Sequence, residues 1–145
     1  MEVIVETKYG KLRGIVADDV NTFKGIPYAA APYGPNRFRP PQEVEPWAGV
    51  RDALAFGPRV PQLGFPPPLS ALLPDNAVNG ENCLSLNIWS PGSGAAGRPV
   101  MVWIHGGAFE LGSSAVPFYD GSRFARDGIV CVTVNYRVGP DGFLY

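Results

Sequence analysis

The run Val100–Ile104 is the feature that most restricts how this chain can fold. Every residue in it is apolar, and a run without polar alternation predicts a strand that is buried on both faces. The run ends abruptly at His105-Gly106-Gly107, which predicts a tight, glycine-rich turn at the carboxyl end of the strand. Open α/β sheets bind their ligands at that end. The run therefore predicts an α/β fold with a functional site at this turn.

The turn itself suggests a chemistry. Adjacent glycines adopt backbone angles that other residues avoid, and they let a ligand approach the main chain closely. Successive N–H groups in such a turn can converge on one anion. His-Gly-Gly followed by a small residue and an aromatic, here Ala108-Phe109, is typical of the oxyanion hole of lipases and esterases. We therefore predict a site for negative charge on a carbonyl oxygen. The alternative is a tight turn with a structural purpose alone.

Composition excludes several classes of function. The chain has 145 residues, a net charge of −1 and 17% charged residues, so we expect a single domain and no nucleic-acid partner. No apolar run approaches the length of a membrane span. Residues 1–6 lack the basic and apolar parts of a signal peptide. Cys83 and Cys131 could form at most one disulfide, and idle thiols suit a cytoplasmic location. No cofactor is expected.

The amino-terminal part of the chain predicts antiparallel strands. Apolar and polar residues alternate through residues 2–17 around a turn at residues 9–11, so we expect a β-hairpin. A third short strand is expected at Val20–Lys24. Prolines then interrupt residues 26–82 too often for a long helix or a central strand. We expect this irregular segment to wrap the domain through Tyr28, Tyr33, Phe38, Trp47, Phe56 and Phe65.

Regular structure is predicted again from residue 83. In residues 83–89, Leu84, Leu86 and Ile88 alternate with polar residues, which predicts a half-buried strand. Residues 92–97 spell G-x-G-x-x-G, but a strand and not a helix follows. We therefore expect a surface loop and no nucleotide site.

The last third of the chain predicts a parallel pair of strands. A short helix is expected at residues 122–127, with Ser122 as its cap and Gly128 after its end. A second fully buried strand is expected at residues 129–135. The order strand, helix, strand is typical of parallel strands joined by a right-handed crossover.

Five strings occur in order along the chain: Gly25-Ile26-Pro27-Tyr28-Ala29, Asn36-Arg37-Phe38, Glu81-Asn82-Cys83-Leu84-Ser85-Leu86-Asn87-Ile88, Val102-Trp103-Ile104-His105-Gly106-Gly107-Ala108-Phe109 and Asn135-Tyr136-Arg137-Val138-Gly139. Together they resemble the amino-terminal part of the type-B carboxylesterases, the family of the cholinesterases and para-nitrobenzyl esterases. The resemblance implies that residues 1–145 are the amino-terminal part of one α/β-hydrolase domain, incomplete at the carboxyl end. An antiparallel edge hairpin would lead into a mostly parallel sheet with a long irregular loop. It also implies that the complete protein hydrolyses small-molecule carboxylic esters through a serine nucleophile and an acyl-enzyme.

The resemblance assigns roles to the glycine turn. Gly107 and Ala108 match the family positions whose N–H groups point at the oxyanion, and Gly106 matches the residue that shapes the turn. A third donor would come from the residue after the nucleophile. These roles make the turn one half of an active site.

The resemblance also concerns the irregular segment. Arg37 and Glu81 match a family pair that forms a buried salt bridge. Cys83 matches one half of a common family disulfide, but Val60 stands at the other half. That disulfide is therefore expected to be absent.

The remaining catalytic groups are missing from these residues. No serine lies in a Gly-x-Ser-x-Gly string, and His105 is the one histidine. A lone histidine at a strand end is typical of a turn-stabilising residue or a pocket residue, and not of a general base. We therefore expect residues 1–145 to supply the oxyanion hole, to need the rest of the domain as partner, and to be inactive alone. The alternative is a catalytically inactive, cholinesterase-like interaction module.

Overall fold

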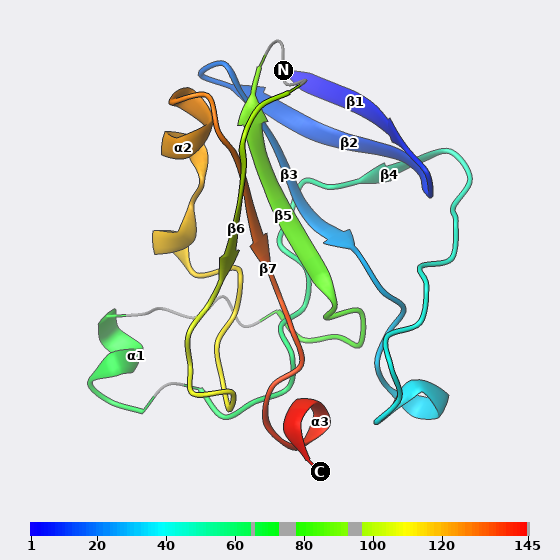
Figure 1. The fold of residues 1–145 in the computed structure, drawn as a ribbon, viewed down its shortest axis with the longest axis vertical. Helices are drawn as coiled ribbons and strands as arrows, with labels where there is room; N and C mark the ends of the chain where they lie inside the picture. Colours follow the sequence, from blue (N-terminus) through cyan, green and yellow to red (C-terminus); the bar gives the residue numbers. More distant parts are fainter. Residues whose placement is uncertain (65, 73–77, 93–96, 145) are drawn as a thin grey trace.

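The amino-terminal residues, in which polar and apolar side chains alternate, form strands at one edge of a mixed sheet (Figure 1). The computed structural model describes residues 1–64, 66–72, 78–92 and 97–144. Strands β1 (Glu2–Thr7), β2 (Gly10–Ala17) and β3 (Val20–Pro27) pair antiparallel in chain order. The predicted hairpin and third strand are therefore confirmed, and β3 runs three residues further than predicted, to Pro27 instead of Lys24.

The sheet continues through strands from the second half of the chain. Its order is β1-β2-β3-β5-β7-β6, and the short β4 (Val50–Asp52) pairs with β2. Strands β6 (Val100–Ile104) and β7 (Val130–Val134) are parallel, as predicted. Strand β5 (Ser85–Pro91) is antiparallel to both β3 and β7. A mostly parallel sheet was expected, but among the described residues the parallel pairs are β6 with β7 and the short β4 with β2, and the other pairs are antiparallel.

The helices are short. They are η1 (Gly34–Asn36), α1 (Leu69–Leu72), η2 (Pro117–Tyr119), α2 (Ser122–Arg126) and α3 (Gly139–Phe143). The predicted helix is confirmed as α2, but its cap is different. Gly121 is the N-cap residue, and the N–H of Ser122 donates to Oδ1 of Asp120 at 2.9 Å. Across the described residues, no helix has the length and apolar character needed to cross a membrane.

Aromatic residues fasten most of the irregular segment to the core, as predicted. Tyr28 and Tyr33 pack on a cluster that contains Val60 and Cys83, whereas Phe56 and Trp47 pack on two other clusters. Phe38 does not take part, because its side chain is exposed. Phe65, residues 93–96 of the G-x-G-x-x-G string and Tyr145 lie outside the described residues.

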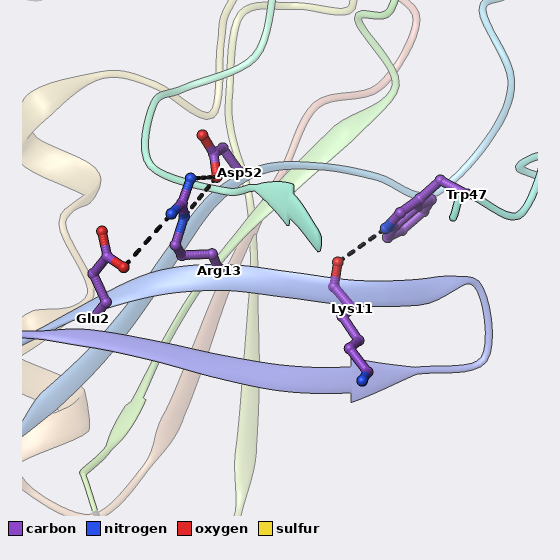
Figure 2. A network of polar contacts seen from close by, with 5 residues as sticks. All are labelled: Glu2, Lys11, Arg13, Trp47 and Asp52. Carbon is purple, nitrogen blue, oxygen red and sulfur yellow. Dashed lines mark hydrogen bonds and ion pairs between the residues drawn. The ribbon is translucent and has the colours of Figure 1, made fainter. Parts of the chain in front are cut away.

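Polar contacts join the hairpin to the irregular segment (Figure 2). Arg13 lies between Glu2 and Asp52, and its Nε donates to Oδ1 of Asp52 at 2.7 Å. The indole N–H of Trp47 donates to the carbonyl oxygen of Lys11 at 2.9 Å. These contacts secure β4 against β2, so a segment without regular structure of its own still has a defined course.

The predicted half-buried strand is confirmed as β5, and its more deeply buried face is not the face of Leu86 and Ile88. Ser85, Asn87 and Trp89 are 1–2% exposed, whereas Leu86 and Ile88 are half-buried. The reason is that irregular segments and α2 cover the face of Ser85, Asn87 and Trp89. Asn87 tolerates this burial because its side-chain amide is fully hydrogen-bonded.

Strand β6 is exposed, which contradicts the prediction of burial on both faces. Val100, Val102 and Ile104 are 55–67% exposed, and Trp103 is 43% exposed. Within the described residues β6 is the outermost strand next to β7, so one edge and one face have nothing packed on them. Strand β7 is intermediate, because Cys131 and Thr133 are buried while its valines are half-buried.

The free cysteine Cys83 packs beside Val60 in one core cluster, as expected for a position where the disulfide is absent. We predict that Val60→Cys forms this disulfide under oxidising conditions. Closing a loop of this length stabilises a protein by about 3 kcal/mol. Urea denaturation of the oxidised and the reduced variant measures the gain, with the reduced form as control. An unchanged midpoint after complete loss of free thiols at both positions would contradict the prediction.

Candidate active site

The glycine turn lies at the carboxyl ends of the parallel strands β6 and β7, close to α3 (Figure 1). Gly106 and Ala108 are exposed and Gly107 is half-buried. The strands position the turn because β6 is held in register by β7 up to Ile104, paired with Val134. The turn follows directly after that pair, at the edge where α/β sheets bind ligands.

The backbone of the turn is strained in a way that glycine alone does not explain. Gly107 has φ 135°, and the next two residues, Ala108 and Phe109, have φ 54° and 65°. A non-glycine residue in this region costs about 1–3 kcal/mol, and such residues gather at functional sites. Gly107 is required by packing as well, because the carbonyl oxygen of Leu111 occupies the place where a Cβ would stand.

The amide groups of the turn have no partners. Among the described residues, the N–H groups of Gly106, Gly107 and Ala108 donate no hydrogen bond. Consecutive N–H groups without internal acceptors form a concavity suited to an anion. Two of these groups, the N–H groups of Gly107 and Ala108, are the donors that the family resemblance implies for an oxyanion, and Gly106 is the residue expected to shape the turn.

The carbonyl groups around the turn are, in contrast, held by donors of this chain. The Tyr136 hydroxyl donates to the carbonyl oxygen of His105 at 2.6 Å, and the Gly139 N–H donates to that of Phe109 at 2.6 Å. The Gly107 carbonyl oxygen accepts hydrogen bonds from the N–H groups three and four residues later in the chain, at 3.0 and 3.1 Å. Fixed carbonyls and free amides leave the turn preorganised to donate and not to accept.

The His105 side chain is buried beside this turn. It is 3% exposed, and its ring stacks on Tyr136 with centroids 4.3 Å apart. Its Nδ1 lies 2.9 Å from the carbonyl oxygen of Gly106, so Nδ1 carries the proton, because a carbonyl can only accept. Burial lowers the pKa of the imidazole below its usual value, which favours the neutral ring. A buried, stacked ring agrees with the prediction of a turn-stabilising or pocket residue, and His105 also lines a hollow beside the turn.

Two open hollows adjoin the turn. One, of about 370 Å³, is lined by Ile104, His105, Gly106, Gly107, Ala108, Phe109, Tyr136 and Phe143. The other, of about 790 Å³, lies between residues 61–63, residues 108–111 and residues 139–144. Ala108, Phe109 and Phe143 line both. The turn therefore faces space in which an apolar group could lie beside the free amides.

The predicted pair of Arg37 and Glu81 is not formed. Nε of Arg37 instead donates to Oδ1 of Asp141 in α3 at 2.7 Å. Glu81 is exposed and has no ion-pair partner among the described residues. The Arg37 side chain is 54% exposed and that of Asp141 is 17% exposed, so the pair that does form is partly open to solvent and is worth about 1 kcal/mol. It ties the residue after η1 to α3.

Sequence reasoning missed several residues that hold the turn. Gln62 and Gly112 carried no recognisable signal, because their contact joins positions far apart in the chain. Tyr136 and Gly139 lay within one of the five family strings, and that string could have indicated them. In the described ranges, no group of three or more His, Cys, Asp or Glu side chains could hold a metal ion.

Comparison with known proteins identifies the family. The sequence model of the carboxylesterase family matches residues 1–145. The chain belongs to this family. This carboxylesterase-family chain is 46% identical over 143 residues to para-nitrobenzyl esterase of Bacillus subtilis, and 47% identical over 146 residues to fumonisin B1 esterase of Sphingopyxis macrogoltabida. A solved structure of PNB esterase superposes with a TM-score of 0.88 at 45% identity. The predicted α/β-hydrolase fold is thereby confirmed.

The carboxylesterase-family chain spans less than a third of the relatives that it matches. The alignments cover 98% of the chain and 29% of para-nitrobenzyl esterase, and 99% of the chain and 26% of fumonisin B1 esterase. The solved PNB esterase is covered to 29%, by 98% of this chain. The similarity to each of these relatives therefore extends over an amino-terminal portion of it.

Proposed function

We propose that this chain is the amino-terminal part of a serine carboxylesterase and that its glycine turn forms the oxyanion hole. The observation that carries the proposal is the contrast at the turn: the N–H groups of Gly106, Gly107 and Ala108 have no acceptor among the described residues, while the neighbouring carbonyls are held. The proposed substrate is a small-molecule carboxylic ester. The relatives' names, para-nitrobenzyl esterase and fumonisin B1 esterase, support that class.

In the proposed mechanism, a serine outside these residues attacks the ester carbonyl carbon. As the carbonyl π bond opens, negative charge moves onto the oxygen, and the N–H groups of Gly107 and Ala108 donate to it. Gly106 shapes the turn so that both donors aim at one point. Each donor of this kind stabilises the transition state by about 2.7–4 kcal/mol. The acid and the general base of the triad are likewise proposed to lie outside residues 1–145.

The alternative of an inactive interaction module has less support. A protein that only binds other proteins has no use for strained, unpartnered amides beside a hollow. For the compartment we propose the cytoplasm, because both cysteines are free and buried, which suits a reducing environment.

The proposal is tested by assaying the full-length gene product and residues 1–145 separately with p-nitrophenyl acetate and p-nitrophenyl butyrate. The full-length product is expected to hydrolyse both esters, with release of p-nitrophenol in a burst from acylation. Residues 1–145 alone are expected to show no turnover above the buffer rate, since the nucleophile is absent. A full-length product without esterase activity would contradict the proposal. So would turnover by residues 1–145 that a substitution within them abolishes.

A further inference from the structure

A glutamine from the irregular segment clamps the backbone that follows the glycine turn. The N–H of Gly112 donates to Oε1 of Gln62 at 2.5 Å, and Nε2 of Gln62 donates to the carbonyl oxygen of Gly112 at 2.7 Å. The side-chain amide therefore pairs with a single residue through both of its ends, which fixes direction as well as distance. The two residues are 50 positions apart in the chain.

Gly112 transmits this contact to the turn. It is buried and has φ 122°, and a Cβ there would strike Nδ1 of His105 and the carbonyl oxygen of Gly106. The backbone at Gly112 therefore lies directly against the imidazole and the first residue of the turn. Its neighbour Leu111 lies in the same way against Gly107. A displacement of residues 111–112 would move the donors of the turn.

Gln62 is itself held on a rigid base. Its Nε2 also donates to the carbonyl oxygen of Val60 at 3.0 Å, and Val60 is 2% exposed in the core cluster with Cys83. Asn135, at the end of β7, donates from Nδ2 to the carbonyl oxygen of Pro58 at 3.1 Å. The segment that carries Gln62 is thus anchored to the core and to the sheet.

We propose that Gln62 is a positioning residue for ester hydrolysis: through Gly112 it holds the oxyanion-binding amides of Gly107 and Ala108 in place. This inference rests on the proposed function. Without Gln62, the buried N–H and carbonyl of Gly112 lose their partners, and the loop shifts to reach others. Small misplacements of a catalytic group lower the rate by up to about 10²-fold. Because oxyanion donors act in the transition state, the loss falls on kcat and not on KM.

The test compares Gln62→Ala and Gln62→Met with the wild type in the full-length gene product. Methionine has a similar length but can form none of the hydrogen bonds of the Gln62 side-chain amide, so it separates the effect of packing from that of the clamp. Gln42→Ala is the matched control, because Gln42 lies in the same segment and donates to the carbonyl of Pro40, two residues back, but is exposed and away from the turn. The measured quantities are kcat, KM and the Ki of an aryl trifluoromethyl ketone, whose hemiketal oxygen mimics the oxyanion.

Both Gln62 variants are expected to lower kcat by about 10- to 100-fold with KM changed less than about threefold. The Ki of the ketone should rise by the factor by which kcat/KM falls, and Gln42→Ala should match the wild type. A Gln62→Met variant with wild-type kcat, or an unchanged Ki, would overturn the positioning role. Loss of folding in both variants would also overturn it, because Gln62 would then act on global stability. An inactive wild type would instead contradict the proposed function itself.

Discussion

Gly107→Ala in the full-length gene product is expected to lower kcat for p-nitrophenyl esters by about 10²- to 10³-fold, the effect of losing one oxyanion donor. Gly107 has φ 135°, and the carbonyl oxygen of Leu111 occupies the position of the new methyl group. A backbone atom cannot move aside as a flexible side chain can, so the turn must change its course. The N–H groups of Gly107 and Ala108 then no longer meet at one point.

The matched control for this substitution is Gly64→Ala. A Cβ at Gly64 meets nothing within 4 Å, and the residue lacks the positive φ of Gly107. Its kcat should stay within about twofold of the wild type. Circular dichroism and the melting temperature show whether Gly107→Ala remains folded. A folded Gly107→Ala variant with kcat near that of the wild type would contradict the role of the turn.

Asn87→Ala is expected to lower the free energy of unfolding by about 3–5 kcal/mol, because it breaks a buried network and leaves a cavity. Oδ1 of Asn87 accepts the N–H of Gly25 at 2.9 Å, at the irregularity where β3 leaves its register with β5. Its Nδ2 donates to the hydroxyls of Thr133 and Ser114 at 2.9 and 3.1 Å. One side chain therefore forms hydrogen bonds with a strand bulge, a neighbouring strand and the loop that follows the glycine turn.

Asn21→Ala serves as the comparison for Asn87. Asn21 is half-buried in β3, and its Nδ2 donates to the carbonyl oxygen of Pro91 at 3.2 Å. Its loss should cost about 1 kcal/mol, the value of an ordinary hydrogen bond. Urea denaturation of both variants measures the difference. Equal losses at the two positions would show that the network around Asn87 contributes no more than a single bond.

The parts of the fold that the sequence predicts are those with local causes. Alternation over residues 2–17 specifies the hairpin, and the order of elements from Val100 to Val134 specifies the parallel pair. The turn was predictable because glycines directly after an apolar strand favour backbone angles that other residues avoid. Ala108 and Phe109 also adopt positive φ values, of 54° and 65°, so the unusual backbone extends beyond the glycines.

The parts that the sequence does not predict depend on distant contacts. The apolar run Val100–Ile104 indicates a strand, but its exposure follows from its place beside β7 at the edge of the sheet. From the sequence, Asn87 is expected to face solvent. The alternation of residues cannot show that its side-chain amide will form hydrogen bonds with Gly25 and Ser114. The sequence offers Arg37 several acidic residues as ion-pair partners. The placement of α3 in the fold makes Asp141 the partner.

A crystal structure of the full-length gene product with a bound aryl trifluoromethyl ketone tests the central claim most directly. The hemiketal oxygen is expected to lie 2.7–3.1 Å from the backbone nitrogens of Gly107 and Ala108, the geometry of oxyanion donors. The Gln62 clamp on Gly112 should be retained in that complex. A hemiketal oxygen bound elsewhere, with these two N–H groups donating to carbonyl oxygens of the protein, would contradict the assignment of the oxyanion hole.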